Sequence, residues 1–145
     1  MKIVEVENLI KIRNKMEKKK TNFGIHLTID GYRGNKEKLN DFELVYNLLD
    51  RLPSEIAMQK LMPPYVILAP PVTKKDQGGI SGFVIIAESH ISIHTFPEKR
   101  FVSIDIYTCR NELDIEKIKT YFKKVFLLEE LEVNVVERGT KFLLS

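Results

Sequence analysis

The alternation of apolar and polar residues changes period several times along the chain, and it predicts a mixture of strands and helices. Alternating stretches rich in β-branched residues predict strands over 22–29, 65–69, 80–89, 90–96, 100–109 and 131–137. Apolar residues at helical spacing predict helices over 3–20, 39–51 and 114–128. We expect Pro53 to interrupt the second helix before a short helical segment at 54–61, and a turn over 31–35.

The order of these elements predicts the fold class. After the first helix the order is β-α-(α)-β-β-β-β-α-β, with a hairpin turn at 97–100. Strands that follow one another through short turns pair antiparallel, and the remaining helices then cover one face. We therefore expect an α+β fold in one domain: a two-layer sandwich of a mainly antiparallel sheet with helices packed on one face.

The two strands of the central hairpin each have an aliphatic face and a polar face. The aliphatic face is expected to lie against the helices. A polar second face is common in antiparallel sheets as a plain solvated surface, and His26 in the first strand is expected to be structural. The pattern alone leaves open whether the polar face is such a surface or a reactive site made of Ser92, His94, Ser103, Asp105, Tyr107 and Cys109.

The composition and charge of the chain argue against several classes of function. The 145 residues, 43% hydrophobic, suit one packed domain. No apolar run approaches the ~18 residues of a membrane helix, so we expect no membrane partner. A single Cys excludes an intrachain disulfide and a Cys-rich zinc site and indicates a reducing, cytoplasmic location. No pair of His has the helical spacing of a zinc site and the Cys has no partner, so we expect no metal. The chain carries +3, but the basic extension 1–20 alone carries +4, so the remainder gives little support for nucleic-acid binding.

The stretch 79–98, GISGFVIIAESHISIHTFPE, followed at the matching spacing by DIYTC at 105–109, resembles the signature of the prokaryotic S-adenosylmethionine decarboxylases. The resemblance is strong over 79–109 and looser over the rest of 22–138. It implies a zymogen that processes itself into a pyruvoyl-dependent lyase. Such an enzyme converts S-adenosylmethionine to decarboxylated S-adenosylmethionine and CO2 for spermidine and other polyamine synthesis.

The resemblance also implies where the chain is cut. The family cleaves itself within Glu-Ser-His, which here lies between Glu88 and Ser89 and gives a β chain 1–88 and an α chain 89–145. The Ser89 hydroxyl would attack the Glu88 carbonyl, and elimination would leave a pyruvoyl group at position 89. This cofactor would form a Schiff base with the substrate amine and accept electrons as CO2 departs.

Other residues match family positions one at a time. His94 matches the histidine that accepts a proton during processing, and Ser81 matches a serine that supports processing. Cys109 matches the cysteine that protonates the substrate carbon, a task that suits a thiol with an ordinary pKa of about 8.5. Glu98 matches the acid that binds the ribose hydroxyls. Phe96 stands where the family often has Trp, as a wall for the nucleoside or sulfonium.

Strand geometry tests these roles within the chain itself. A turn at 97–100 places Cys109 opposite residue 88, beside the expected cut. His94 lies five residues from Ser89, about 16 Å along a strand, and Ser81 lies eight residues away, about 26 Å if extended. We therefore expect a homodimer of processed α/β protomers with shared active sites. In it, Ser81, His94 and Glu98 of one chain complete the site at Ser89 and Cys109 of the other.

The sequence departs from the family pattern at two places, and these departures leave open two functions other than decarboxylation of S-adenosylmethionine. The loop 72–79 lacks the aromatic residue often found there, and Asp30 stands where Glu is common. One alternative is a pyruvoyl decarboxylase of the same family that acts on arginine or ornithine. The other is an unprocessed homologue that serves as a binding or regulatory module, with the basic extension as its contact.

Overall fold

The computed structural model describes residues 22–142, so the helix expected over 3–20 lies outside the described residues. Its helical elements are α2 (Lys36–Leu39), α3 (Phe42–Glu55), the 3-10 turn η1 (Pro97–Lys99) and α4 (Ile115–Phe126). Its strands are β1 (Gly24–Tyr32), β2 (Tyr65–Ala69), β3 (Gly79–Ile86), β4 (Ser89–Phe96), β5 (Phe101–Thr108) and β6 (Glu130–Arg138). The predicted order of the strands and of the two long helices is confirmed across the described residues, whereas the short helix lies before α3, at Lys36–Leu39, and not after it.

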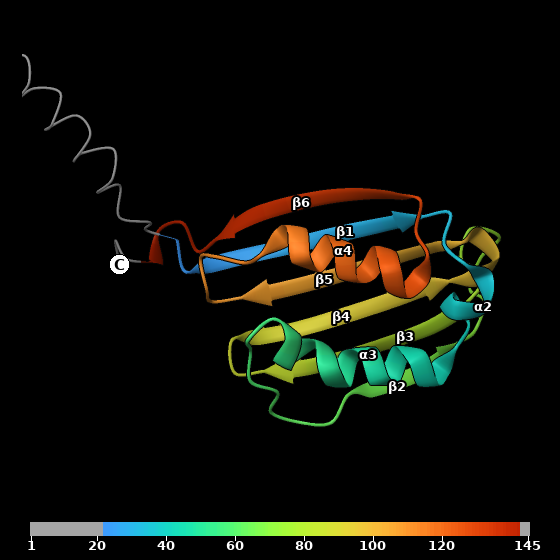
Figure 1. The fold of residues 1–145 in the computed structure, drawn as a ribbon, viewed down its shortest axis with the longest axis horizontal. Coiled ribbons are helices and arrows are strands. Elements are labelled where there is room, and N and C mark those ends of the chain that lie inside the picture. Colours follow the sequence, from blue (N-terminus) through green and yellow to red (C-terminus); the bar gives the residue numbers. More distant parts are fainter. Residues whose placement is uncertain (1–21, 143–145) are drawn as a thin grey trace, which may run out of the picture.

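The strands form one sheet in the order β2-β3-β4-β5-β1-β6, and each neighbouring pair is antiparallel. Helices α3 and α4 lie side by side over the same face of this sheet (Figure 1). The expected two-layer α+β sandwich is therefore confirmed. We call the sheet face opposite these helices the open face.

The core lies between the sheet and the two long helices. Alternate residues of the central strands, such as Leu27, Ile93 and Ile104, are fully or almost fully buried there, and each contributes about 1.5–3 kcal/mol by leaving water. Both helices begin at a capping residue: the side chains of Asp41 and Asp114 accept hydrogen bonds from backbone N–H groups in the first turn. Caps and core together fix the helices on one side, which leaves the open face for other roles.

Two expectations about element ends were wrong. Pro53 lies inside α3, which continues to Glu55, and no helix follows over 56–61. The proline lacks an N–H and so forfeits a backbone hydrogen bond, but it does so near the end of the helix and its side chain is buried in the core. The favourable free energy of burying the Pro53 side chain therefore outweighs the cost of the lost backbone hydrogen bond at this position.

Strand β1 also runs further than expected. Gly31 does not start a turn, because it pairs with Val102 on one side and with Leu131 on the other. The two flanking strands hold the backbone extended to Tyr32. No helix within residues 22–142 is long and apolar enough to cross a membrane.

Candidate active site

The hairpin of β4 and β5 has the register that the sequence predicts. His94 pairs with Ser103, and Ser89 pairs with Thr108. One step further, the backbone N–H of Cys109 donates a 2.9 Å hydrogen bond to the carbonyl oxygen of Glu88. The expected position of Cys109 beside the 88–89 peptide is therefore confirmed.

The backbone of Ser89 is strained. A two-residue turn, Ala87–Glu88, joins β3 to β4, and Ile86 pairs with Ser89 across it. The φ angle of Ser89 is 146°, in a region that normally only glycine adopts. Strain at the residue whose peptide bond is expected to break raises the energy of the intact chain there.

The Glu88 side chain is held from two sides and is only 13% exposed. One carboxylate oxygen accepts a 2.9 Å hydrogen bond from the Arg110 guanidinium, and the other accepts a 3.2 Å bond from the Gln59 backbone N–H. The Gln59 carbonyl in turn accepts a 2.8 Å bond from the Ala87 N–H. Sequence reasoning missed Arg110, although the hairpin register places residue 110 next to residue 88.

Ser81 and His94 lie together on the open face, away from Ser89. They are cross-strand partners, and the Ser81 Oγ lies 2.9 Å from His94 Nδ1. The expected 26 Å between Ser81 and Ser89 was wrong, because the turn before β4 folds the chain back and leaves Ser81 beside His94. Both residues are therefore about 16 Å from Ser89 along the strands.

Phe96 and Glu98 lie at the far end of the same hairpin. The Phe96 ring stacks on Phe101, with ring centroids 5.5 Å apart. The Glu98 carboxylate pairs with Lys36 at 2.7 Å and is more than half exposed. A cavity of about 460 Å³ opens here, lined by Lys75, Asp76, Phe96, Lys99 and Phe101.

A polar network occupies the open face between these two ends. Asp105 lies 2.8 Å from His26 Nε2, and an Arg138 nitrogen lies 3.3 Å from His26 Nδ1. Arginine can only donate, so Nδ1 accepts and Nε2 donates to Asp105; this ordered pair fits the structural role expected for His26. Burial, with Glu132 and Asp105 nearby, raises the pKa of Asp30.

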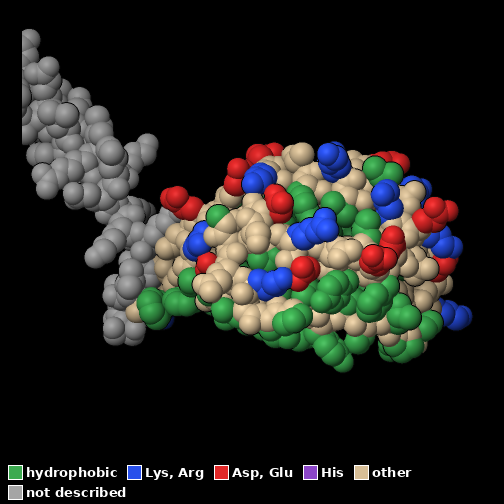
Figure 2. Space-filling model, turned by 60° about the horizontal axis from the view of Figure 1, so that its bottom comes forward, with side chains coloured by type: hydrophobic (Ala, Val, Ile, Leu, Met, Phe, Trp, Pro, Cys, Tyr) green, Lys and Arg blue, Asp and Glu red, His purple; other side chains and the backbone are tan. Residues whose placement is uncertain are grey.

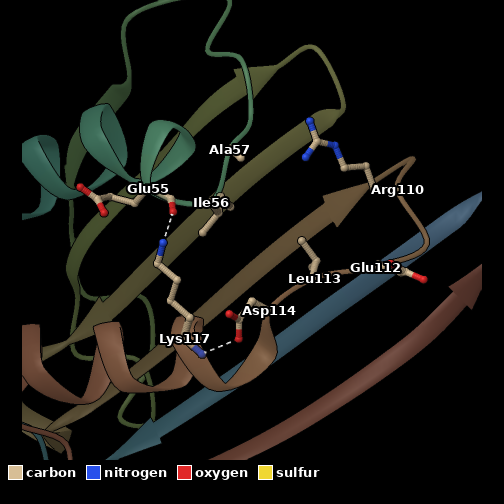
Figure 3. A pocket seen from close by; sticks show the side chains of 8 residues that line it. All are labelled: Glu55, Ile56, Ala57, Arg110, Glu112, Leu113, Asp114 and Lys117. Carbon is tan, nitrogen blue, oxygen red and sulfur yellow. Dashed lines mark hydrogen bonds between the residues drawn. The ribbon is translucent and has the colours of Figure 1, made fainter.

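A second cavity, of about 430 Å³, lies between the end of α3 and the start of α4. Figure 3 shows its lining, with the Lys117 ammonium donating a 2.7 Å hydrogen bond to the Glu55 carbonyl. Arg110 stands at its rim and turns its guanidinium towards the β3–β4 turn. Nowhere in residues 22–142 do three or more His, Cys, Asp or Glu side chains group as a metal site.

Exposed apolar side chains gather at the β2 edge of the sheet. Figure 2 shows hydrophobic side chains along this lower edge of the molecule. Tyr65 and Phe83 are cross-strand neighbours with ring centroids 5.9 Å apart. They are exposed on the open face, together with Ile67 and Ile85. Apolar patches of this kind on a stable domain mark surfaces that contact another molecule.

Comparison with known proteins gives a consistent result. The profile of the S-adenosylmethionine decarboxylase family matches residues 25–139. An S-adenosylmethionine decarboxylase proenzyme from Clostridium botulinum (strain Langeland) is 34% identical over 116 residues, which cover 80% of this chain and 94% of that protein. A proenzyme of the same name from Pyrococcus abyssi is 46% identical over 61 residues, 42% of this chain and 44% of that protein.

A solved structure shares the fold as well. The crystal structure of the adenosylmethionine decarboxylase from Aquifex aeolicus VF5 superimposes with a TM-score of 0.68 at 27% identity. The match covers 81% of this chain and 92% of that chain. Sequence and fold therefore point to the same group of proteins.

Proposed function

Because this chain belongs to the S-adenosylmethionine decarboxylase family, we propose that it is cut between Glu88 and Ser89 and that its active site combines residues from two copies. The chain is a self-processing, pyruvoyl-dependent lyase that converts S-adenosylmethionine to decarboxylated S-adenosylmethionine and CO2 for polyamine synthesis. The observation that carries the assignment of residues is the Cys109 N–H on the Glu88 carbonyl, beside a strained Ser89.

The geometry around Ser89 fits the first step of processing. Attack of the Ser89 Oγ on the Glu88 carbonyl carbon forms a C–O bond and places negative charge on the carbonyl oxygen. The Cys109 N–H already donates to that oxygen and can stabilise the charge. Breaking the C–N bond then gives an ester, frees the Ser89 nitrogen and releases the backbone strain.

The second step needs a base. Removal of the Ser89 Cα proton breaks the Cβ–Oγ bond, so Glu88 leaves as a carboxylate and residue 89 becomes dehydroalanine. Tautomerisation and addition of water then release ammonia and leave the pyruvoyl group. His94 is the proposed base; the Ser81 hydroxyl at 2.9 Å can orient its ring.

In turnover the pyruvoyl group supplies an electron sink for the loss of CO2. The residues of the chain then bind the substrate and move a proton. Cys109 is exposed and free of any disulfide, so its thiol can protonate the substrate carbon after CO2 leaves. Phe96 and Glu98 are proposed to bind the nucleoside end, the aromatic ring by stacking and the carboxylate by accepting from the ribose hydroxyls.

These roles need a second copy of the chain. His94 is about 16 Å from Ser89 of its own chain along β4, too far for proton transfer. A homodimer that packs open face against open face brings His94 of one copy to Ser89 of the other. The exposed apolar residues Tyr65, Ile67 and Phe83 on that face support this packing. The single, unpaired Cys109 supports a reducing, cytoplasmic location.

Mixed dimers test both parts of this proposal. A Ser89→Ala chain and a His94→Ala chain, carrying different tags, are co-expressed and the doubly tagged dimer is isolated. Intact mass should show cleavage at 88/89 in the His94→Ala chain only, because it alone has Ser89 and borrows His94. Radiolabelled CO2 should be released from S-adenosylmethionine and not from arginine or ornithine. Isolated hybrid dimers that stay uncut, or no dimer at all, would contradict the shared site.

A further inference from the structure

The structure assigns a role to Arg110: we propose that it is a positioning residue for self-cleavage, which holds the Glu88 carboxylate so that Ser89 keeps its strained backbone. This inference rests on the proposed cut between Glu88 and Ser89. Arg110 touches neither the Ser89 hydroxyl nor the Glu88 carbonyl in the structure. It acts through the Glu88 side chain, 2.9 Å from its guanidinium.

The contact is of the kind that holds a geometry. Both partners are charged, and the carboxylate is 13% exposed while the Arg110 side chain is 45% exposed. A charge-assisted hydrogen bond to a shielded carboxylate is stronger than an ion pair in open water. The second carboxylate oxygen is bound by the Gln59 N–H. Glu88 is thus fixed at both oxygens, from two different parts of the chain.

The turn needs such fixing from outside. A residue in a glycine-only region of φ persists only where surrounding contacts force it to, and Ser89 has a φ of 146°. On one side, the segment around Gln59 bonds to the backbone of Ala87 and to the side chain of Glu88. On the other side, the segment after β5 contributes the Cys109 N–H and the Arg110 guanidinium. Without Arg110, the second side loses its contact with the Glu88 side chain and keeps only backbone pairing, including the Cys109 N–H on the Glu88 carbonyl.

The location of Arg110 separates this role from a general structural one. It follows β5, is exposed at the rim of a cavity and contributes nothing to the apolar core. Its removal therefore leaves the packing of the sheet and helices intact. The expected effect falls on the rate at which the 88–89 bond rearranges, and much less on the stability of the fold.

The same contact has a use after the cut. Cleavage turns residue 88 into a chain end with a new carboxylate beside its side-chain carboxylate. Arg110 and the backbone N–H groups of Gln59 and Cys109 are placed to hold this doubly acidic end. The end then stays at the β3–β4 turn and leaves the space at residue 89 to substrate.

The rate of processing tests the proposal. Freshly purified full-length chain is incubated, and cleavage is followed by intact mass. We expect Arg110→Ala to slow cleavage about tenfold to a hundredfold, the size of effect seen when reacting groups are misplaced by about 1 Å. Arg110→Lys should recover part of the rate, and Glu88→Gln should slow it without adding to Arg110→Ala. Arg33→Ala, which removes two exposed ion pairs at the opposite end of the sheet, is the control.

Two further measurements separate positioning from folding. Hydroxylamine cleaves an ester but not an amide, so it should cut less of the Arg110→Ala chain than of the wild type. The uncleaved pair Ser89→Ala and Ser89→Ala/Arg110→Ala should have the same melting temperature. Cleavage of Arg110→Ala at the wild-type rate, or a drop in melting temperature that matches the slower cleavage, would overturn the proposal. Cleavage of the wild type at another bond, or none at all, would instead refute the proposed function.

Discussion

The two ends of strand β4 differ in almost every respect, although Phe96 lies only seven positions after Ser89. At the Ser89 end, a tight turn is held by backbone hydrogen bonds and a shielded ion pair, and its backbone is strained. At the Phe96 end, aromatic rings line a cavity of about 460 Å³, and the carboxylate of Glu98, two residues further along the chain, is exposed. These differences match the proposed roles of the two ends, self-cleavage at Ser89 and substrate binding at Phe96.

The comparison shows how a small sheet can support two tasks. A strained backbone persists only where surrounding contacts hold the chain in place. Substrate binding, in contrast, requires side chains that remain accessible. A single strand about 23 Å long keeps the two requirements apart within one copy. A two-fold axis can bring them together between copies.

The largest effect is expected at the Ser89 end. Ser89→Ala removes both the attacking oxygen and the precursor of the pyruvoyl group, so cleavage and CO2 release should both be lost completely. Intact mass and a labelled CO2 assay measure the two losses. Ser54→Ala, which removes an exposed hydroxyl from α3, should behave as the wild type. A cleaved Ser89→Ala chain would show that the bond-breaking end has been misidentified.

A smaller loss is expected when the side chain of Cys109 is removed. Cys109→Ala keeps the backbone N–H that faces the Glu88 carbonyl, so the chain should still be cut. The processed enzyme should lose about 10²–10⁴-fold in kcat, the usual contribution of a positioned proton donor. Single-turnover CO2 release on material of verified mass checks this. Failure of Cys109→Ala to cleave would mean that the thiol itself belongs to the bond-breaking step.

The Phe96 end should respond in substrate binding alone. Glu98→Gln should raise KM about tenfold, the loss of roughly one hydrogen bond to a charged group, while the rate of cleavage stays unchanged. Steady-state kinetics and intact mass separate these outcomes. Glu116→Gln breaks a comparable exposed ion pair, with Lys119, and serves as the control. Slower cleavage in Glu98→Gln would show that the two ends are less independent than their contacts indicate.

The smallest effect is expected for the thermal stability of the fold, through Asp30 in strand β1. Burial raises the pKa of Asp30, and the negative charges of Glu132 and Asp105 add to the effect. The stabilising contribution of Asp30 is therefore complete below the pKa of the unfolded chain and is lost as the pH rises through the higher pKa of the folded chain. Asp30→Asn in the Ser89→Ala background should melt slightly higher than its parent at about pH 7 and no higher at about pH 3. A larger increase in melting temperature at about pH 3 than at about pH 7 would contradict the predicted direction of the effect.

Much of the sheet could be predicted from sequence because apolar and polar residues alternate in the central strands β4 and β5. Buried Ile91 and Ile93 against exposed His94 fix the face of β4, and a turn at 97–100 fixes the register to Cys109. Pro53 was misjudged because burial decided its place, and sequence alone does not show burial. The separation of Ser81 from Ser89 was misjudged because the chain was treated as extended where it folds back.

Side-chain contacts were harder to predict than strands. Nothing local in the sequence indicates that Arg110 binds Glu88, since the two are 22 positions apart. The hairpin register offers the one available signal, because it places the residue after Cys109 next to the turn. The backbone angle of Ser89 has no local signature either, because contacts from Gln59 and Arg110 on other segments support it.

The order of strands has a last consequence for the lifetime of the enzyme. A cut after Glu88 assigns β1, β2 and β3 to one fragment and β4, β5 and β6 to the other, yet β1 lies between β5 and β6. The fragments are therefore interleaved and separate only if the sheet is torn apart. Folding must precede the cut, and the unfolded pieces no longer hold the Ser89 precursor. After complete unfolding the two fragments can diffuse apart, so recovery of activity requires them to meet and fold together again, and the unfolding rate bears on how long each molecule works.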